Sequence, residues 1–274
     1  MEQHNLEKLK AVLSTGSPLA HESFDYVYRD IKEDLCLSSI SGGTDIVSCF
    51  ALGCPTRPVY AGELQCRGLG MAVDIFDDNG KAIRGDKGEL VCTKPFPSMP
   101  IGFWNDPEGE KYHDAYFASF DNVWAHGDYA EITEHDGLII HGRSDAVLNP
   151  GGVRIGTAEI YQQVNHIEGV VDSIAVGKAS EHNEEIWLFI QLESQIELTE
   201  PLKTTIKNQL KSACSPRHVP SQIFVISDIP KTRSGKLVEL AVKQVVNGNP
   251  VENIGAIANA EVLEEIKQTI TKKG

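Results

Sequence analysis

The sequence is short of basic residues. It contains 25 lysines and arginines against 39 aspartates and glutamates, which gives a formal net charge of −14 at pH 7. A surface of this sign repels phosphate backbones and anionic lipid headgroups, so we expect neither nucleic acid nor a membrane as a partner. A local pocket in an acidic protein can still bind a nucleotide, so ATP is not excluded.

Long apolar runs and paired cysteine motifs are also lacking. Runs such as residues 137–140 are far shorter than the roughly 20 residues that cross a bilayer, and the N-terminus begins polar, without an apolar signal core. The six cysteines form no Cys-x-x-Cys pair, a pattern typical of free thiols in a reducing compartment. We therefore expect a cytoplasmic protein.

The common fingerprints of nucleotide-binding, hydrolase and zinc-protease sites are missing. The sequence has no Gly-x-x-x-x-Gly-Lys-Ser/Thr, no Gly-x-Gly-x-x-Gly, no Gly-x-Ser-x-Gly and no His-Glu-x-x-His. Any function must therefore be sought in other motifs.

The patterns that are present indicate a mixed α/β and α+β chain with two domains, residues 1–144 and 145–274. A short strand near Val12, a helix over residues 24–31 and a strand over 35–40 form a parallel α/β pattern. Short β-rich runs between residues 55 and 99, with an Asn79-Gly80 turn, predict a small antiparallel β-barrel. Helical spacing also predicts a helix over residues 5–12.

The second half of the chain reads as a compact α+β unit. Helices are expected from Thr157, from Thr199 and around Leu263, with strands over 173–176, 186–192 and 223–226. Pro201 in the first turn of the second helix supports that start.

The stretch from Gly142 to Glu159 combines four glycines with two arginines, two acids and a proline. This density of turn formers suits a hinge with a binding loop, in which Arg143 and Arg154 can fork onto phosphate or ribose oxygens. The alternative is a surface loop between two domains.

Three further segments are candidate sites. After the strand at 35–40, the Thr44 hydroxyl can bond a phosphate and Asp45 can hold Mg²⁺, unless Asp45 is the N-cap of a helix from Ile46. Asp128 can accept two ribose hydroxyls, or it is a turn aspartate that bonds its own backbone. Lys236 ends a loop with three basic residues in six, which is otherwise a solvated turn.

Four stretches in this order resemble the core motifs of the adenylate-forming acyl-CoA synthetases. The stretches are Ser39-Ile40-Ser41-Gly42-Gly43-Thr44-Asp45, Trp124-Ala125-His126-Gly127-Asp128, Gly142 to Glu159, and Pro230-Lys231-Thr232-Arg233-Ser234-Gly235-Lys236. The resemblance implies the end of a large AMP-binding domain followed by a mobile C-terminal α+β domain, with ATP, Mg²⁺ and coenzyme A as reactants.

The resemblance also implies a role for each candidate residue. Adenine would lie along Gly16, Ser17 and Pro18, the α-phosphate would contact Gly43 and Thr44, and the ribose would bind Asp128 and Arg143. Asp45 would bind Mg²⁺, although the family more often has glutamate at this position. The acid would bind at Ile40, Ser41 and Gly42, and coenzyme A would bind at Gly151, Gly152 and Arg154. Lys236 would stabilise the charge that develops during adenylate formation. Asp145 would be the hinge that lets Lys236 leave for the second half-reaction.

The substrate implied by the resemblance is acetoacetate. Ser14 to Leu19 and Ser39 to Asp45 are most similar to acetoacetate-activating members, and Gly42 stands where acetate-activating members have a bulky tryptophan. Room left by the missing indole favours a longer acid, so Gly42→Trp is predicted to favour acetate.

One motif of the family is absent. Its members carry an upstream Ser/Thr/Gly-rich loop ending in lysine, which grips the β- and γ-phosphates of ATP, and this sequence lacks it. We therefore expect the C-terminal part of a longer ligase, inactive by itself. The alternatives are another short-chain acyl-CoA synthetase or amino-acid-adenylating enzyme, and a non-catalytic chain that binds AMP or a protein.

Overall fold

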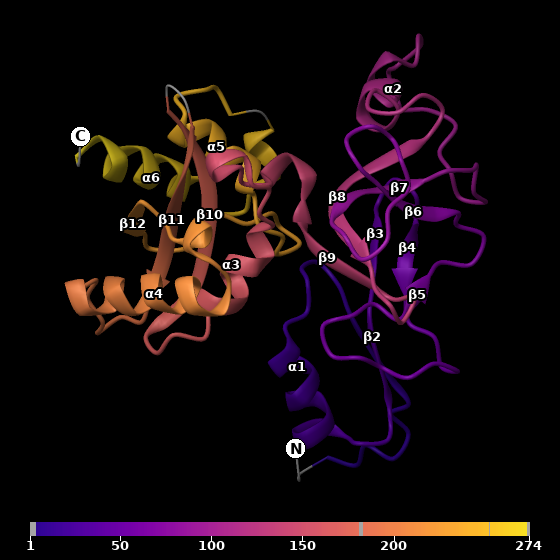
Figure 1. Cartoon of the computed structure of the whole chain (residues 1–274), viewed down its shortest axis with the longest axis horizontal. Helices are drawn as coiled ribbons and strands as arrows, with labels where there is room; N and C mark the ends of the chain where they lie inside the picture. Colours follow the sequence, from indigo (N-terminus) through magenta and orange to yellow (C-terminus); the bar gives the residue numbers. More distant parts are fainter. Residues whose placement is uncertain (1–3, 181–182, 252, 273–274) are drawn as a thin grey trace. The chain divides into compact units, whose positions relative to one another are not determined.

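The computed structural model describes residues 4–180, 183–251 and 253–272, and the chain divides into two compact units, 1–144 and 145–274. Figure 1 labels most of the helices and strands of both units. Mixed helices and sheets confirm the predicted fold class. Within the described ranges, no helix is both long enough and apolar enough to span a membrane.

The first unit begins with a parallel β-α-β arrangement. Strand β1 (Ala11–Ser14) pairs in parallel with β2 (Cys36–Ser39), and helix α1 (His21–Tyr26) lies between them in the sequence. A π-helical turn, Val27–Ile31, extends α1. A small apolar cluster of Phe24, Val27 and Leu37 packs the helix against β2, as the sequence predicted.

The predicted helix over residues 5–12 is wrong. The Leu6 carbonyl accepts from the Leu9 amide at 3.0 Å in a single turn, and the carbonyl oxygens of Leu6, Glu7 and Leu9 accept hydrogen bonds from the Lys32 ammonium at 3.2, 3.1 and 2.7 Å. Val12 belongs to β1. The apolar spacing was therefore a coincidence that a tertiary contact overrode.

The rest of the first unit is antiparallel. One sheet contains β3 (Ser41–Gly43), β4 (Ser48–Leu52) and β5 (Cys66–Arg67), and a second contains β6 (Val73–Phe76), β7 (Gly88–Cys92), β8 (Trp124–Ile132) and β9 (Leu138–Arg143) in that order. A bridge between Leu64 and Leu138 links them, and both sheets contribute to one apolar core. Helix α2 (Glu110–Tyr116), which the sequence did not predict, lies between β7 and β8 in the chain.

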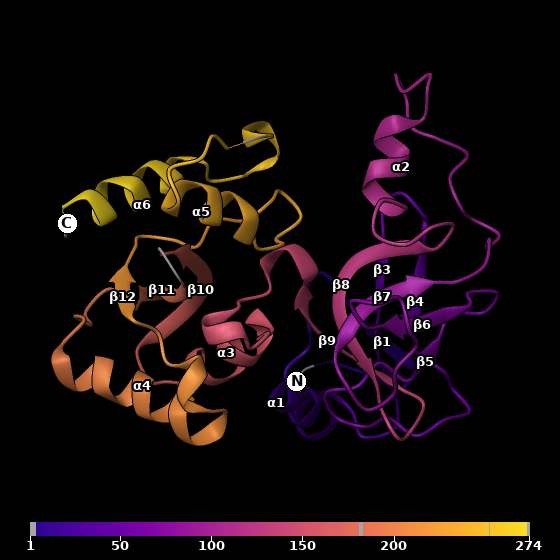
Figure 2. The same cartoon turned by 45° about the horizontal axis from the view of Figure 1, so that its top comes forward.

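The second unit is a three-stranded sheet covered on both faces. Strands β10 (Val170–Ala179) and β11 (Glu184–Leu192) are antiparallel, and β12 (Gln222–Val225) adds to β11 in parallel. Figure 2 shows α5 (Glu239–Val246) and α6 (Glu261–Thr271) on one face and α3 (Thr157–Val164) and α4 (Glu200–Ala213) on the other. Alternate strand residues supply the two cores, since successive side chains point to opposite faces.

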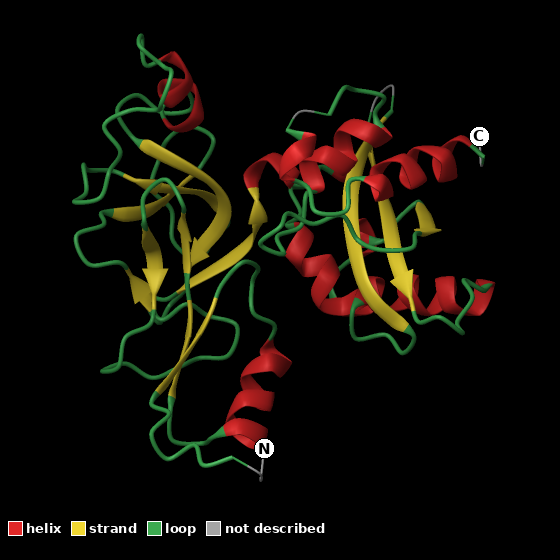
Figure 3. Ribbon diagram, turned by 180° about the vertical axis from the view of Figure 1, so that it is seen from behind, coloured by secondary structure: helices red, strands yellow, loops and turns green. Residues whose placement is uncertain are grey.

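Helix starts in this unit are close to those predicted. Thr199 caps α4, its hydroxyl accepting from the Leu202 amide at 3.4 Å, with Pro201 in the first turn. Helix α3 begins at Thr157, the residue from which a helix was expected, and Gly156 occupies the cap position. The buried Thr157 hydroxyl donates to Glu239 at 3.2 Å. The ribbon in Figure 3 shows these helices along the sheet.

Candidate functional site

Two predicted binding segments leave the same edge of the β1–β2 sheet. Ser14 pairs with Ser39 at the carboxyl ends of both strands, and the Ile40 amide donates to the Ser14 carbonyl at 2.9 Å. Beyond this point one chain continues through the exposed Gly16–Pro18 turn, where Gly16 has φ of 99°, and the other through half-buried residues 40–43. Crevices outside the carboxyl ends of parallel strands are common ligand sites.

Residues 41–52 form a hairpin, so Asp45 does not start a helix. Strand β3 turns through residues 44–47 and returns as β4, which leaves Thr44 and Asp45 exposed on the turn. The helix-cap alternative for Asp45 is therefore wrong. Gly42 has a packing role of its own, because a Cβ there would lie 2.1 Å from the Ser48 carbonyl oxygen and 2.7 Å from the Cys49 Cα.

Asp128 lies at the centre of a polar cluster that joins three of the predicted site residues. It is buried in β8, and its Oδ2 accepts from the Ser41 hydroxyl at 3.2 Å while Oδ1 accepts from Arg143 Nη1 at 3.3 Å. Arg143 Nη1 also donates to the His126 carbonyl at 3.1 Å. The turn-aspartate alternative is wrong, since Asp128 bonds side chains from β3 and β9. We call Ser41, Asp128 and Arg143 the carboxylate cluster.

Gly127 shapes the backbone beside this cluster. Its φ is 80°, and a Cβ there would lie 2.5 Å from Arg143 Nη2, so a side chain would displace the guanidinium. Gly43 is close to the same group of residues, because a Cβ on it would lie 3.0 Å from His126 Cε1. The two glycines let the backbone approach the imidazole and the guanidinium.

Helix α2 reaches Asp45. The Tyr116 hydroxyl donates to Asp45 Oδ2, and its ring stacks on Trp124 with centroids 3.6 Å apart and an interplanar angle of 15°. Burial, then the hydrogen bond and negative charge of Asp45, raise the pKa of Tyr116 well above its ordinary value. Tyr116 therefore keeps its proton and acts as a donor. Tyr116 was not predicted as a site residue, because α2 was not predicted.

Glu89 was also missed. This β7 carboxylate accepts from the Gly127 amide at 2.6 Å and from the Ser144 hydroxyl, next to the predicted hinge. Burial raises the pKa of Glu89, and the two donors oppose that rise. A glutamate in a strand of otherwise apolar residues was the available signal, but its partners lie far away in the sequence.

Asp45 is the single carboxylate that would bind a magnesium ion at this site. Within the described residues, no group of three or more His, Cys, Asp or Glu side chains is placed to hold a metal. Asp45 is exposed and offers one carboxylate, which fits Mg²⁺ because that ion commonly takes one or two protein carboxylates and completes its shell with phosphates and water.

In the second unit, the predicted hinge and glycine turn occupy two short 3₁₀ elements. Asp145 lies in Ser144–Ala146, and its carbonyl accepts from Lys243 Nζ at 3.5 Å. Gly151 and Gly152 lie in Pro150–Gly152 with φ of 62° and 79°, and Arg154 follows, exposed.

Arg217 holds the glycine turn. Its Nη1 donates to the carbonyls of Pro150 and Gly151 at 3.1 and 3.3 Å, and the Gly151 amide donates to Asn183 Oδ1 at 2.6 Å. A Cβ on Gly151 would lie 2.2 Å from Arg217 Nη1. Sequence reasoning missed Arg217, which lies in the 3₁₀ element Pro216–His218.

Lys236 lies at the end of a tight turn. The Thr232 amide donates to the Lys236 carbonyl at 2.8 Å, the Lys236 amide donates to the Thr232 hydroxyl at 3.1 Å, and Gly235 has φ of 84°. The side chain of Lys236 is exposed. We call residues 232–236 the lysine turn.

Comparison with known proteins agrees with these motifs. Residues 159–236 match the AMP-binding enzyme C-terminal domain. The chain is 58% identical to the acetoacetyl-coenzyme A synthetase of Rhizobium meliloti (strain 1021), over 95% of this chain and 40% of that protein. The chain is a homologue of the acetoacetyl-CoA synthetases. It is also 50% identical to the acetoacetyl-CoA synthetase of Gallus gallus, over 96% of this chain and 40% of that protein.

Solved structures support the same relationship. The acetoacetyl-CoA synthetase from Streptomyces lividans superimposes with a TM-score of 0.90 at 38% identity, covering 98% of this chain and 42% of that one. An anthranilate CoA ligase, at 20% identity and a TM-score of 0.74 over 89% of this chain and 46% of its own, shows the shared fold alone. This acetoacetyl-CoA synthetase homologue thus spans about 40% of the length of the curated relatives it matches.

Proposed function

We propose that the chain contributes to an AMP-forming acid–CoA ligase that converts acetoacetate, ATP and coenzyme A to acetoacetyl-CoA, AMP and pyrophosphate. The observation that carries this proposal is the carboxylate cluster, in which Ser41, Asp128 and Arg143 come together from three strands. A carboxylate beside a guanidinium suits the ribose and phosphate of a nucleoside monophosphate. The relatives are named acetoacetyl-CoA synthetases.

In the proposed site, Asp128 accepts the two ribose hydroxyls. Two carboxylate oxygens suit two adjacent hydroxyls, and Arg143 and Ser41 hold the carboxylate in one orientation. The backbone at Gly43 and the Thr44 hydroxyl bind the α-phosphate, and the exposed residues 16–18 lie along the adenine. Ile40, Ser41 and Gly42 line the acid pocket.

Lys236 acts in the first half-reaction. A carboxylate oxygen of the acid attacks the α-phosphorus of ATP, pyrophosphate leaves, and the ammonium stabilises the charge that develops. Asp45 would hold Mg²⁺, which would neutralise phosphate charge when bound. Tyr116 keeps the Asp45 side chain in place through its hydrogen bond.

In the second half-reaction the thiol of coenzyme A attacks the acyl-adenylate and AMP leaves. Rotation about Asp145 withdraws Lys236 and brings Gly151, Gly152 and Arg154 to the coenzyme. Within the described residues, no atom outside the adjoining residues lies within 4 Å of the position of a Cβ at Gly152, so the coenzyme can approach the backbone there, and Arg154 offers a guanidinium for phosphate.

Pyrophosphate release tests the proposal. The purified chain is incubated with ATP, Mg²⁺ and acetoacetate, with acetate as the competing acid and Lys236→Ala as the control. Acetoacetate-dependent release that the control lowers by a hundredfold or more, as expected for losing a transition-state cation, supports a catalytic chain. Release with acetate but not with acetoacetate contradicts the proposed substrate. AMP binding without any release identifies the chain as an incomplete ligase or a binding remnant.

A further inference from the structure

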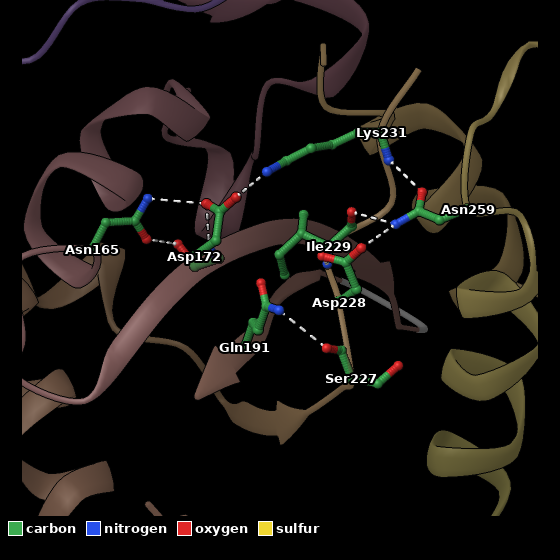
Figure 4. A network of polar contacts seen from close by, with 9 residues as sticks. Asn165, Asp172, Gln191, Ser227, Asp228, Ile229, Lys231 and Asn259 are labelled. Carbon is green, nitrogen blue, oxygen red and sulfur yellow. Dashed lines mark hydrogen bonds and ion pairs between the residues drawn. The ribbon is translucent and has the colours of Figure 1, made fainter. Parts of the chain in front are cut away.

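The lysine turn is anchored by a polar network at its base. Lys231, the residue before the turn, extends its ammonium to Asp172 on β10, and the Nζ and Oδ2 atoms are 2.5 Å apart (Figure 4). The two side chains are 37% and 20% exposed, so the ion pair is partly shielded from solvent. An ion pair of this kind is worth more than a fully exposed one.

Asp172 is itself fixed in orientation. Its Oδ1 accepts from the Asn165 amide nitrogen at 3.2 Å and from the Ser173 backbone amide at 2.8 Å, and the Ser173 hydroxyl donates to Asn165 Oδ1 at 2.6 Å. With Oδ1 held twice, Oδ2 can face only a narrow range of directions. The carboxylate therefore gives Lys231 one defined partner position.

Asn259, just before α6, holds the backbone on both sides of Pro230. Its Oδ1 accepts from the Lys231 amide at 3.0 Å, and its Nδ2 donates to the Ile229 carbonyl at 2.9 Å and to Asp228 Oδ2 at 2.8 Å. The Lys231 carbonyl accepts from the Ala258 amide at 2.8 Å. Figure 4 shows Asn259 and Asp172 approaching Lys231 from opposite sides.

The position of Lys231, at the base of the turn, determines the direction in which Lys236, at its end, extends. Lys231 and Leu237 form an antiparallel bridge on either side of the turn, and Thr232 is hydrogen-bonded to Lys236 across it. A second bridge joins Thr232 to Ile257, in the segment that precedes Asn259. Few backbone torsions are free between the anchored Lys231 and the Lys236 side chain.

We propose that Asp172 and Asn259 are positioning residues for Lys236, acting through Lys231. The proposal rests on the proposed function for the role of Lys236. It gives Lys231 a structural role, although this residue belongs to the same basic motif. Only Lys236 would then contact the reacting phosphate. The network would keep the Lys236 ammonium at a fixed position relative to the base of the turn.

The first experiment measures the network without any reaction. Hydrogen–deuterium exchange of residues 231–237 is compared in the full chain, Asn259→Ala and Asp172→Asn. Asp172→Asn is nearly isosteric and keeps an acceptor for Ser173, so it removes mainly the charge opposite Lys231. We expect exchange to be faster by roughly three- to tenfold in both variants, as for the loss of one hydrogen bond or ion pair.

The matched control is Gln191→Ala. Gln191 Nε2 donates to the Ser227 carbonyl at 3.1 Å, so it belongs to the same region but does not contact Lys231. Its exchange over residues 231–237 should match that of the unmodified chain. Unchanged exchange in both Asp172→Asn and Asn259→Ala overturns the proposal, as does an equal rise in Gln191→Ala.

The second experiment separates positioning from general loosening. Acetoacetate-dependent ATP–pyrophosphate exchange reports adenylate formation, and conversion of supplied acetoacetyl-adenylate with coenzyme A reports the second half-reaction. We expect Asp172→Asn and Asn259→Ala to lower the first rate by roughly tenfold to a hundredfold, because a small misplacement of a catalytic group is costly. The second rate should stay within about twofold, since Lys236 acts only in the first.

The two experiments distinguish the possible failures. Equal losses in both half-reactions indicate destabilisation and overturn the positioning role. If the unmodified chain catalyses neither half-reaction by itself, as expected for part of a longer ligase, the hydrogen–deuterium exchange experiment alone decides whether Asp172 and Asn259 hold the turn.

Discussion

At the scale of single residues, the contacts of Arg143 in the carboxylate cluster need the several donors of a guanidinium, which a lysine does not have. One guanidinium nitrogen contacts both the His126 carbonyl and Asp128, and the planar group has further donors for a ribose or phosphate oxygen. A lysine ammonium at the same place has no such fork. The orientation of Asp128 therefore depends on the type of cation and not on charge alone.

We predict that Arg143→Lys raises the dissociation constant for AMP by roughly tenfold, in line with one lost charge-assisted hydrogen bond. Isothermal titration of the purified chain with AMP measures it. Arg233→Lys, an exposed arginine of the lysine turn, is the control and should bind AMP unchanged. Equal affinity for Arg143→Lys and the unmodified chain would contradict the assignment of Arg143 to the nucleotide.

Glu239 gives a residue-scale prediction for stability against pH. The Glu239 carboxylate is buried at the start of α5, where its Oε1 accepts from the hydroxyls of Thr157 and Tyr161 at 3.2 Å each. Burial raises the pKa of Glu239 above its ordinary value of 4.5, and the nearby charge of Asp145 adds to the rise. The folded state thus binds the proton more tightly than the unfolded state does.

It follows that Glu239 lowers the free energy of unfolding as the pH rises from about 4.5 through its folded pKa. Glu239→Gln removes this dependence, so its stability relative to the unmodified chain should increase with pH over that interval and be constant above it. Urea unfolding at a series of pH values measures the difference. Glu264→Gln, on the exposed side of α6, should give no such trend, and a flat difference for Glu239→Gln would refute the argument.

Motif resemblance assigned Ser41 to the acid and Asp128 and Arg143 to the ribose, and these roles stay predictions. The structure brings the three side chains into contact. The sequence could not identify Tyr116 or Arg217, because each acts on a partner 66 or more residues away, and no local pattern encodes that distance.

At the scale of elements, the β3–β4 hairpin requires glycine at position 42. The Ser48 carbonyl oxygen would lie 2.1 Å from a Cβ, so even alanine forces the two strands apart. Gly42→Trp, predicted from sequence to favour acetate, would therefore disturb this hairpin before it fills any acid pocket. Substrate choice is better tested with acids of different length than with this substitution.

We predict that Gly42→Ala lowers the free energy of unfolding of the first unit by about 1–3 kcal/mol, the usual range for overpacking. Thermal or urea unfolding measures the loss. Gly255→Ala is a suitable control, because a Cβ at Gly255 meets nothing within 4 Å and its φ is not positive. A Gly42→Ala variant as stable as the control would show that β4 can move aside.

The two helices that the sequence failed to predict lack a side-chain cap, as do α1, α3 and α6, which their apolar spacing indicated instead. Helices α2 and α5 begin after Gly109 and Val238 without a side-chain cap, so the usual start signal is missing. Thr199 supplies that signal for α4, and there the prediction is confirmed. Tertiary packing stabilises the uncapped helices, as the apolar contacts of Val242 and Val246 show for α5.

At the scale of the whole molecule, each unit has its own apolar core. The first contains clusters around Phe50 and Phe24, and the second has one on each face of its sheet. Asp145 begins the second unit within the 3₁₀ element Ser144–Ala146. Two separately packed units joined at one residue suit a mechanism in which the proposed half-reactions use different relative orientations.

The last prediction concerns this joint. Proline fixes φ near −65°, so Asp145→Pro restricts the joint to conformers with that torsion, whereas Asp145→Ala leaves it free. We expect Asp145→Pro to lower one half-reaction by at least roughly a hundredfold and to leave the other within a few-fold, because each needs its own orientation. Assays of pyrophosphate exchange and of thioester formation from supplied acetoacetyl-adenylate measure the two separately. The unfolding transitions of both variants are measured beside the rates, because Ala146 and Leu148 next to the joint are buried and Leu148 belongs to a core of the second unit. If Asp145→Pro slows both half-reactions equally, or neither, rotation at Asp145 is not what alternates the two activities, and the glycines at 151 and 152 become the next positions at which to restrict the backbone.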